Sequence, residues 1–434
     1  MTEETAKLLA AVQDGTVPEG YTKVWHLMPE DWKDVPLSHI FKKKRQKNKG
    51  NNVKTVFTNS AVNGIIPQSE YFEKDIANTE NTEGYFVVDP LDYVYNPRIS
   101  ENAPYGPFKR NDTGLTGIVS PLYTVLTPRK EFAKSEFLHY YLESEQWHKY
   151  AYSIANCGAR FDRMNITDDE LMRLPIAWPS LAEQERIAEI LMQCDKVIKL
   201  HQDKADELKK LKKACLKGLF PEKGAAIPKI RFPGYEDTWE QKKLGDISSF
   251  ITKGATPTTY GFSWQTDGIP FFRNDCIRNN TFVYGDFSYI SESANEALRR
   301  SEIQGNDILI AITGDIGKVS IVPKTIKKAN INQHIARIRV ESGEPYFVYQ
   351  YLASDAIQKD YKKIKTGISM PQLSLEQIRG TVISMPTAKE QRAIGMFFES
   401  LDNLIFLNQQ EIDEWNDKKK FLTQALLTGV VRVK

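Results

Sequence analysis

The sequence has no stretch long and apolar enough to cross a membrane. Its longer apolar runs, such as Ile308–Ile312, fall well below the roughly 18 residues that span a bilayer. The N-terminus reads Met-Thr-Glu-Glu-Thr, with early acids and no apolar core, so it is unlike a signal peptide. The four cysteines are scattered and form no CxxC pair, which argues against a zinc site or a disulfide framework. These absences predict a protein of the reducing cytoplasm.

The chain also lacks an excess of charge of either sign. Its 58 Lys and Arg residues nearly balance its 56 Asp and Glu residues, for a net charge of +2. A nucleic-acid-binding protein is often strongly basic. Any electrostatic contact with DNA must therefore come from local clusters. A near-neutral balance is also expected where much of the surface meets protein partners.

Motifs of common cofactor and metal enzymes are missing as well. The sequence contains no GxGxxG loop after a strand, no GxxxxGK[ST] phosphate loop and no HExxH. Asn96-Pro97-Arg98 differs from the Asn-Pro-Pro-aromatic sequence of adenine methyltransferases. No spaced Asp…Glu-x-Lys nuclease cluster stands out. We therefore expect a non-catalytic chain that binds no cofactor and no metal.

What the sequence does contain is an internal repeat. Glu183–Gln184 recurs as Glu390–Gln391, at an offset of 390 − 183 = 207 residues, and the same offset relates Trp32 to Trp239. A constant offset at both ends of a unit indicates two copies of one plan. Between these ends, residues 42–157 and 249–366 share little beyond strand-like patterning. The offset also relates Leu37 to Leu244, Ile40 to Ile247, Leu171 to Ile378, Pro179 to Pro386, Ile187 to Ile394, Asp195 to Asp402 and Lys212–Lys213 to Lys419–Lys420.

The C-terminal part of each copy reads as a long helix. Apolar residues recur at steps of three and four from Ile187 and from Ile394, which is coiled-coil spacing. Residues 187–219 alone would form a helix of roughly 50 Å at about 1.5 Å per residue. We expect each helix to pair with its copy. His201 and Asn408 occupy equivalent positions in the apolar seam, and we interpret them as residues that fix register.

The interior of each copy reads as mixed α and β structure. Short β-branched and aromatic runs alternate with turn signals such as Asn96-Pro97 and Thr313-Gly314. The aromatic stretches 136–142 and 346–352 read as helices, and we expect their aromatic residues to pack in the core.

Basic and amide residues gather at corresponding places in the two interiors. Lys and Arg neutralise DNA phosphates, and Arg, Asn and Gln can also pair with base edges. Two loops, 156–165 and 365–374, add a glycine at which backbone can approach a phosphate closely. The candidate DNA-binding residues are Lys42, Lys43, Lys44, Arg45, Lys47, Arg98, Lys109, Arg110, Arg160 and Arg163 in the first interior, and Lys253, Arg273, Asn274, Arg278, Lys318, Lys365, Thr366, Ser369 and Gln372 in the second.

The repeated residues resemble a known family. The two Glu-Gln-x-x-Ile motifs, the Asp eleven residues past each Gln and the Lys-rich helix ends look like the helices of type I restriction-modification specificity subunits. In the second copy, Leu244-Gly-Asp-Ile, Gly268-Ile-Pro-Phe-Phe-Arg-Asn and Asp307–Val319 resemble that family's target-recognition domain. The first copy departs from this pattern in its interior, where it looks like another branch of the same domain.

The resemblance implies a fold and a division into domains. It implies an α+β protein with two mixed α/β target-recognition domains in a pseudo-two-fold arrangement, separated by two long antiparallel coiled-coil helices. The expected parts are an N-terminal helical segment at residues 1–19, target-recognition domain 1 at 20–178, a central long helix at 179–222, target-recognition domain 2 at 223–386 and a C-terminal long helix at 387–434.

The resemblance also implies a function. Each domain would read one half of a bipartite double-stranded DNA site, and the helices would set the spacer and dock methyltransferase subunits. Two such subunits would supply S-adenosylmethionine chemistry, and restriction-translocation subunits would use ATP and Mg²⁺. Two alternatives stay open, namely a coiled-coil interaction scaffold that does not read DNA and a stand-alone DNA-modifying enzyme.

Overall fold

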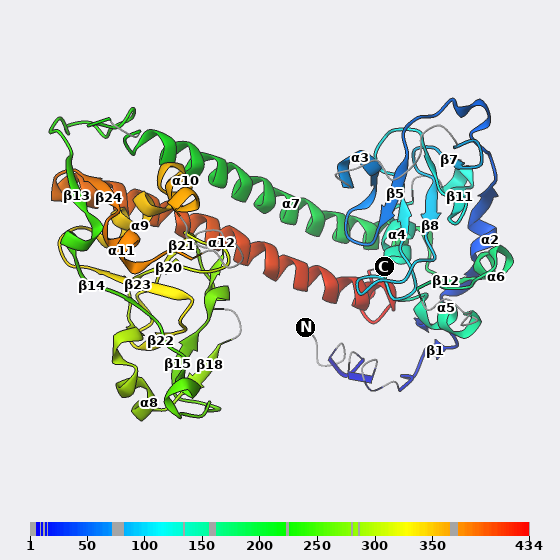
Figure 1. The fold of residues 1–434 in the computed structure, drawn as a ribbon. Helices are drawn as coiled ribbons and strands as arrows, with labels where there is room; N and C mark the ends of the chain where they lie inside the picture. The colour runs from blue at the N-terminus through cyan, green and yellow to red at the C-terminus, as the bar shows by residue number, and fades with distance from the viewer. Residues whose placement is uncertain are drawn as a thin grey trace. The chain divides into compact units, whose positions relative to one another are not determined.

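The chain folds into two compact units, which are described separately. Unit 1 comprises residues 1–200 and 412–434, and unit 2 comprises residues 201–411. Two long helices, α7 (Leu181–Gly218) and α12 (Ala388–Leu427), each contribute to both units (Figure 1). The computed structural model describes residues 6–8, 10–11, 14, 16–71, 82–132, 135–155, 162–222, 225–278, 281–284, 287–364 and 372–433.

Unit 1 is built mainly from short strands. Of the N-terminal helical segment expected at residues 1–19, residues 6–8 and 10–11 are helical, residues 14 and 16–19 are not, and the rest lies outside the described residues. The elements before α7 are β1 (Tyr21–Lys23), β2 (Leu27–Pro29), β3 (Lys33–Pro36), α2 (Leu37–Ile40), β4 (Phe41–Lys44), η1 (Lys49–Asn51), β5 (Phe57–Ser60), β6 (Gly64–Pro67), α3 (Gln68–Tyr71), β7 (Phe86–Val88), β8 (Tyr93–Tyr95), β9 (Phe108–Arg110), β10 (Gly117–Val119), β11 (Thr124–Pro128), η2 (Lys130–Phe132), α4 (Glu136–Glu143), α5 (His148–Ile154), α6 (Asp168–Met172) and β12 (Pro175–Trp178).

Unit 2 follows the same course and adds strands in its middle. Its elements before α12 are β13 (Glu240–Lys243), η3 (Leu244–Ile247), β14 (Ser248–Lys253), η4 (Pro257–Tyr260), β15 (Ile269–Phe272), η5 (Asn274–Cys276), β16 (Ile277–Arg278), β17 (Thr281–Phe282), β18 (Ser288–Ile290), α8 (Glu292–Ala297), η6 (Arg299–Ser301), β19 (Glu302–Ile303), β20 (Ile308–Ala311), β21 (Val319–Ile321), β22 (Ala329–Ile331), β23 (Ile335–Val340), α9 (Pro345–Ala353), α10 (Asp355–Ile364), α11 (Leu375–Arg379) and β24 (Val382–Met385).

The two interiors share a sheet that their sequences do not reveal. Unit 1 has an antiparallel sheet in the order β4-β11-β8-β9, and unit 2 has the equivalent sheet β14-β23-β20-β21. A two-stranded ladder also recurs, as β3–β12 and as β13–β24, with all four strands related by the offset of 207. Unit 2 carries in addition a mixed sheet, β18-β15-β22-β19. Divergent sequences therefore retain one topology.

Each unit closes its core with residues from both long helices. In unit 1, Trp32 and Ile187 pack with Leu426–Leu427 near the end of α12. In unit 2, Trp239 and Ile394 pack with Leu219–Phe220 just after α7. Burying such large apolar side chains removes area from water, at about 25 cal/mol per Å². The repeated tryptophans are therefore anchors of the two cores.

The aromatic helices α4 and α9 pack as predicted. Phe137 and Tyr141 are fully buried in the unit 1 core, and Phe347 is fully buried in the unit 2 core beside Tyr351. Burial raises the pKa of Tyr141 because the charged phenolate is disfavoured away from water. These rings are structural.

The Glu-Gln repeat caps and anchors the starts of the long helices. Ser180 Oγ accepts from the backbone N–H of Glu183 at 3.3 Å, and Thr387 Oγ1 does the same for Glu390 at 3.4 Å. The glutamines beside them donate back to Pro179 and Pro386 carbonyls at 3.0 and 2.7 Å. Each buried glutamate binds an arginine, Arg432 in unit 1 and Arg231 in unit 2, through two contacts of 2.7–3.0 Å.

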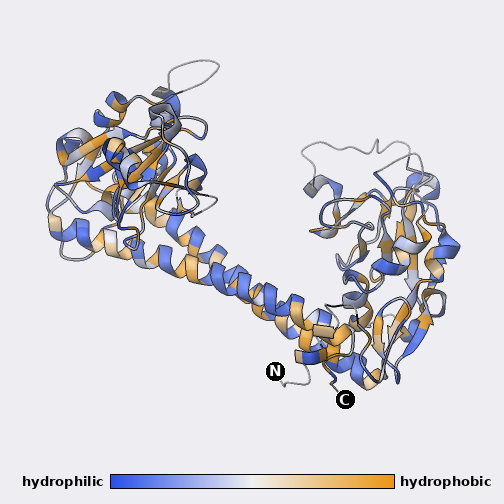
Figure 2. Ribbon diagram, turned by 90° about the horizontal axis from the view of Figure 1, so that it is seen from below, coloured by the Kyte–Doolittle hydropathy of each residue, from blue (hydrophilic) through white to orange (hydrophobic). Residues whose placement is uncertain are grey.

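The long helices run antiparallel to each other within each unit. In unit 1 Lys419 meets Asp195, and in unit 2 Lys212 meets Asp402, each at 2.6 Å. Figure 2 shows hydrophobic and hydrophilic residues interspersed along the long-helix region. In unit 2 the seam residues His201 and Asn408 also meet, with His201 Nδ1 3.1 Å from Asn408 Oδ1. Amide oxygens only accept, so this ring nitrogen donates.

Candidate nucleic-acid interface

Most of the described candidate DNA-binding residues lie at one end of the repeated sheet. We call this the turn end. In unit 1 it is where β4 and β8 finish and β11 begins, since Lys44 pairs with Val125 and Tyr95 with Thr124. In unit 2 it is where β14 and β20 finish and β23 begins (Figure 1). The loop before α6 or α11 returns to this end in each unit.

In unit 1 the returning loop places two arginines side by side. Arg98, just after β8, forms an antiparallel bridge with Arg163. Two backbone hydrogen bonds flank the bridge, from Ile99 to Asp162 at 3.0 Å and from Met164 to Pro97 at 2.8 Å. Arg98 is exposed, whereas the side chain of Arg163 is 22% exposed and lies 3.5 Å from Asp162. Two arginines thus lie together at the turn end of the unit 1 sheet, which we call the unit 1 edge.

Tyr123 lies directly before β11 and completes this edge. The charges of Arg98 and Arg163 act on its hydroxyl. Burial raises the pKa of Tyr123 despite these cations. Its hydroxyl therefore stays protonated and can donate a hydrogen bond at neutral pH.

In unit 2 the same edge is formed by neutral polar groups. Thr313, after β20, forms an antiparallel bridge with Gln372, and Leu373 N donates to the Ile312 carbonyl at 3.0 Å. Thr313 Oγ1 lies 2.8 Å from His334 Nδ1. Asn274 Nδ2 donates to the Thr313 carbonyl at 3.2 Å. The turn that carries arginine in unit 1 thus carries threonine here.

Gln333 is an exposed member of this group. Its Oε1 accepts from the Thr256 hydroxyl, and its Nε2 lies 3.1 Å from His334 Nε2. The backbone N–H of His334 is in turn held by Asn332 Oδ1 at 3.2 Å. An exposed amide is therefore fixed at both of its ends.

Some of the predicted lysines are ion-paired within unit 1. Lys44 Nζ lies 2.6 Å from both Asp89 and Asp92, and Lys43 contacts Asp168. Burial tends to lower the pKa of Lys44, but its bonds to Asp89 and Asp92 outweigh this and raise it. Lys42, Arg45 and Lys47 are exposed on the same segment.

Lys109 and Arg110 are also engaged by carboxylates. Lys109 donates to Glu143 at 2.7 Å. Arg110 makes two bonds of 2.9–3.0 Å to Glu136 and one of 2.6 Å to Asp112. Arg110 lies at the far end of β9, opposite Tyr93. A role of this pair in DNA binding would require these bonds to open.

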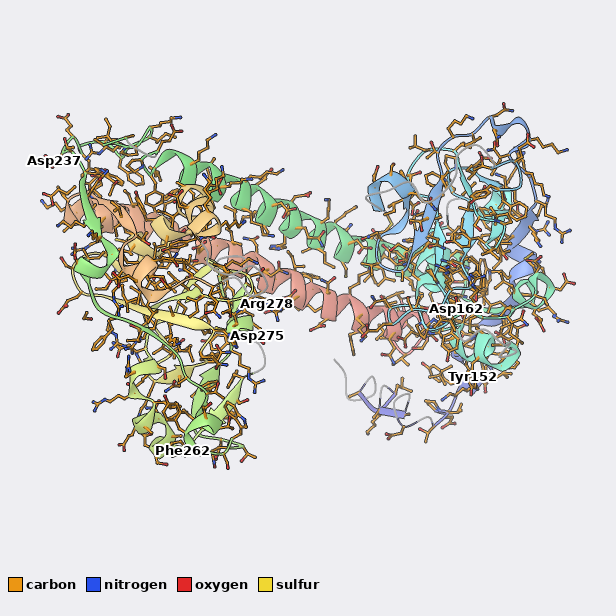
Figure 3. All side chains as sticks on the ribbon, viewed as in Figure 1. Tyr152, Asp162, Asp237, Phe262, Asp275 and Arg278 are labelled. Atoms are coloured by element: carbon orange, nitrogen blue, oxygen red, sulfur yellow. The ribbon has the colours of Figure 1, made fainter. Side chains whose placement is uncertain are left out.

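The remaining candidates in unit 2 are more accessible. Lys253 is exposed at the end of β14, and Lys318 contacts Asp315 at 2.5 Å. Arg273 donates to Ser288 at 3.1 Å and lies 5.5 Å from the ring of Trp264. Arg278 is exposed and donates to the Asp275 carbonyl at 3.2 Å, and Figure 3 shows these two residues close together. Arg160, Lys365, Thr366 and Ser369 lie outside the described residues.

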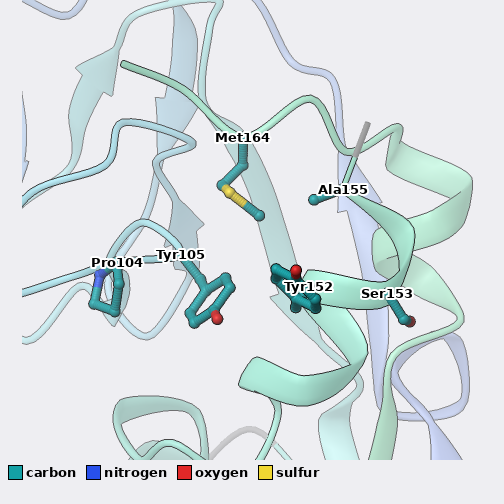
Figure 4. Close-up of a pocket in the computed structure, with 6 residues that line it drawn as sticks. All are labelled: Pro104, Tyr105, Tyr152, Ser153, Ala155 and Met164. Atoms are coloured by element: carbon teal, nitrogen blue, oxygen red, sulfur yellow. The ribbon is translucent and has the colours of Figure 1, made fainter. Parts of the chain in front are cut away.

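A cavity of about 510 Å³ opens beside the unit 1 edge (Figure 4). Its wall includes Tyr105, Tyr152 and Met164, and Met164 directly follows Arg163. Tyr152 is 72% exposed and meets Tyr105 edge to face, with ring centroids 6.5 Å apart. Ala155, also on its wall, directly precedes residues 156–161, which are outside the described set.

Tyr123, Gln333 and His334 were not among the residues predicted from the sequence. None belongs to a basic cluster, so charge gave no signal. The usable signal was position, because Tyr123 and His334 directly precede β11 and β23, the strands that pair with the central strands β8 and β20, and Gln333 adjoins His334.

Two absences among the described residues concern metal sites and membrane spans. Within that part of the chain, no group of three or more His, Cys, Asp and Glu side chains is arranged to hold a metal ion. No described helix combines the length and the apolar character needed to cross a membrane.

The structure thus defines a tandem protein, with two copies of one mixed α/β domain built onto a pair of long antiparallel helices. The family described as the type I restriction modification DNA specificity domain matches residues 29–210 and again residues 236–416. These two matches cover most of the chain. The chain therefore belongs to the type I restriction-modification DNA specificity family and carries two of its domains.

Individual relatives agree with this assignment. The MjaVIII type I specificity subunit of Methanocaldococcus jannaschii is 23% identical over 94% of each chain. A protein described as the MjaX specificity subunit of the same organism is 28% identical over 63% of each chain, so the match spans less than two thirds of that relative.

Solved structures show the same fold. A chain from a study of complex assembly in a type I R-M system is 17% identical, with a TM-score of 0.55, over 93% of this chain and 98% of that one. The type I S subunit of M. genitalium is 16% identical, with a TM-score of 0.53, over 93% of this chain and 96% of that one.

Proposed function

We propose that this chain is the DNA-reading subunit of a type I restriction-modification complex, and that each unit reads one half of a bipartite site. The observation that carries the proposal is the turn end. Two copies of one sheet present different polar side chains at the same place, arginines in unit 1 and amides with a histidine in unit 2. A repeated scaffold with unlike edges suits the reading of two unlike half-sites.

Phosphate contacts would come from the accessible cations around each turn end. In unit 1 these include Lys42, Lys47 and Arg45, whose side chain is 74% exposed. In unit 2 they include Lys253 and Arg278. Such contacts supply affinity that falls steeply with salt but carry no sequence information. Lys43, Lys44, Lys109 and Arg110 are paired with carboxylates, so we assign them lower weight as DNA contacts.

The long helices would set the unread spacer. The 38 residues of α7 span about 57 Å at about 1.5 Å per residue. Half-sites one DNA turn apart are separated by about 34–36 Å, a distance that such a helix can span.

The helices would also dock the methyltransferase subunits. Leu200 and Leu407, related by the offset of 207, are 66% and 54% exposed, and Phe406 beside the latter is 59% exposed. Exposed apolar side chains at equivalent helix positions are typical of a protein-binding surface. The catalytic chemistry, with S-adenosylmethionine on methyltransferase subunits and ATP and Mg²⁺ on restriction-translocation subunits, would belong to these partners and not to this chain.

Methylation mapping tests the reading function. DNA from cells that express the chain with its methyltransferase subunit would be sequenced with base-modification detection. The proposal expects a split motif of two short specified halves around a fixed gap. A continuous motif, or methylation by the chain alone, would point to a modifying enzyme. An assembled, active complex without sequence preference would point to a scaffold.

The docking surface has its own test. Leu200→Asp with Leu407→Asp should reduce co-purification of the methyltransferase subunit at least tenfold. Gln202→Asp with Gln409→Asp is the matched control, because these exposed residues each lie two positions after the leucine on the same helix. Equal loss in both double variants would contradict the assigned surface.

A further inference from the structure

We propose that Arg98 and Gln333 are the base-reading side chains of the two units, with Arg98 reading a guanine and Gln333 an adenine. This inference rests on the proposed DNA-reading function. It adds the residues that determine specificity and the class of base that each one recognises.

The first step is that the two edges are assembled from the same three segments. One segment is the turn after the central strand, β8 or β20. The second precedes the adjacent strand, β11 or β23, and ends in Tyr123 or His334. The third is the loop that leads to a capping box, at Thr167 before α6 and at Ser374 before α11, again at an offset of 207. Equivalent segments therefore meet at one place in both units.

The second step is that Gln333 is held ready for pairing. His334 Nε2 faces an amide nitrogen, which can only donate, so this ring nitrogen accepts. The ring proton is then on Nδ1, which donates to Thr313 Oγ1 at 2.8 Å. The Thr256 hydroxyl donates a hydrogen bond to Gln333 Oε1. Because both ends of the amide are already held, the Gln333 side chain loses little further conformational entropy when it binds DNA.

The third step is the hydrogen-bonding capacity that Gln333 keeps. A primary amide has two N–H donors and a carbonyl with two lone pairs. The contacts with His334 and Thr256 use one of each. One donor and one acceptor remain, which is the pair that matches N7 and N6 of adenine in the major groove.

The fourth step concerns Arg98. Among the described residues no carboxylate lies within ion-pair distance of its guanidinium, in contrast to Arg110 on the same sheet. Its backbone N–H donates to Asn96 Oδ1 at 3.0 Å, which fixes the turn. An exposed arginine on a fixed turn can make the two-bond contact with O6 and N7 of guanine.

The experiment is methylation mapping of single variants in the complex with the methyltransferase subunit. Gln333→Ala should relax one adenine position in one half of the motif. Arg98→Ala should relax one guanine position in the other half. Each loss of discrimination should be about tenfold or more, as expected for one two-bond base contact. The half that a variant leaves specified shows that the protein has folded.

Two matched controls lie at the opposite end of the same two sheets, beside the strands that pair with β23 and β8. Gln304 is exposed before β20, and Lys130 is exposed after β11. Gln304→Ala and Lys130→Ala should leave the motif unchanged. Gln333→Glu, which retains only acceptors, should shift the adenine position toward cytosine, whose N4 amino group donates.

The outcomes separate this inference from the function on which it rests. If the wild-type complex yields no split motif, the proposed function itself fails. If it does, but Gln333→Ala and Arg98→Ala retain the wild-type motif, the base-reading assignment is overturned. Relaxation of the same half by both variants would also overturn it.

Discussion

Lys212 Nζ lies 2.6 Å from Asp402 Oδ1 in unit 2, and its repeat partner Lys419 lies 2.6 Å from Asp195 in unit 1. Asp402 also accepts from Tyr346 at 2.8 Å. The repeated Asp of one long helix thus contacts the Lys-rich end of the other. The same contact occurs once in each unit and joins the antiparallel helices.

Removing this contact should destabilise the unit that contains it. Lys212→Met should lower the free energy of unfolding by about 1–2 kcal/mol, because it leaves the partly buried Asp402 without its cation. Lys213→Met, at an exposed neighbouring position, should change it by less than about 0.5 kcal/mol. Urea unfolding of the two variants measures the difference. Equal stabilities would contradict the role of the repeat.

Substitutions of Lys44 and Lys42 on β4 should distinguish a lysine that stabilises the fold from one that contacts DNA. Lys44→Met should cost about 2–4 kcal/mol of unfolding free energy, since Asp92 is buried and would be left without its cation. Lys42→Met should cost little stability but weaken DNA binding and reduce its dependence on salt by about one phosphate contact. Chemical unfolding and a salt titration of binding test the pair. The assignment fails if Lys44→Met is fully stable.

The contribution of the Lys44 pair should depend on pH in a defined way. The hydrogen bond from Lys44 lowers the pKa of Asp89, so its stabilisation exists above the ordinary carboxyl pKa, about 3.9, and is lost as pH falls through the lowered value. Because the pKa of Lys44 is raised, the stabilisation that its charge contributes is lost only as pH rises through that raised pKa. The deficit of Lys44→Met should stay constant from about pH 5 to 9 and shrink below about pH 4. A deficit that grows in acid would contradict this.

The sequence predicted the repeated ends of each copy because their residues make local or repeated contacts. Trp32 and Trp239 enter the two cores, Glu183 is capped by Ser180, and His201 meets Asn408. Because each of these contacts requires a particular side chain, the same or similar residues occur in both copies at a constant offset. The shared interior sheet was not predicted, because strands buried on a common topology tolerate many apolar residues.

The candidate site was predicted only in part, for a different reason. Lys44 and Arg110 look like DNA ligands in the sequence, but their partners Asp92 and Glu136 lie 48 and 26 residues away. Local sequence does not show such pairing. Conversely, Gln333 and His334 carry no cluster of charge, and only the fold shows that they stand where Tyr123 stands in unit 1.

Lengthening both helices should lengthen the spacer. Insertion of one heptad after Asp203 and another after Gln410 keeps the apolar seam in register and adds about 10 Å. The gap in the methylated motif should grow by about three base pairs, at about 3.4 Å per pair, with both halves unchanged. An insertion in one helix alone is the control and should disrupt the pairing. An unaltered gap would show that the helices do not set it.

The most direct test of the account is an interior exchange read out by methylation mapping. Residues 42–157 would be replaced by the equivalent interior of another family member, while the paired helices and unit 2 are retained. The account predicts that one half of the split motif changes to that of the donor, and that the other half and the gap stay as they were. A change in both halves, or in neither, would contradict the claim that each unit reads one half-site on its own.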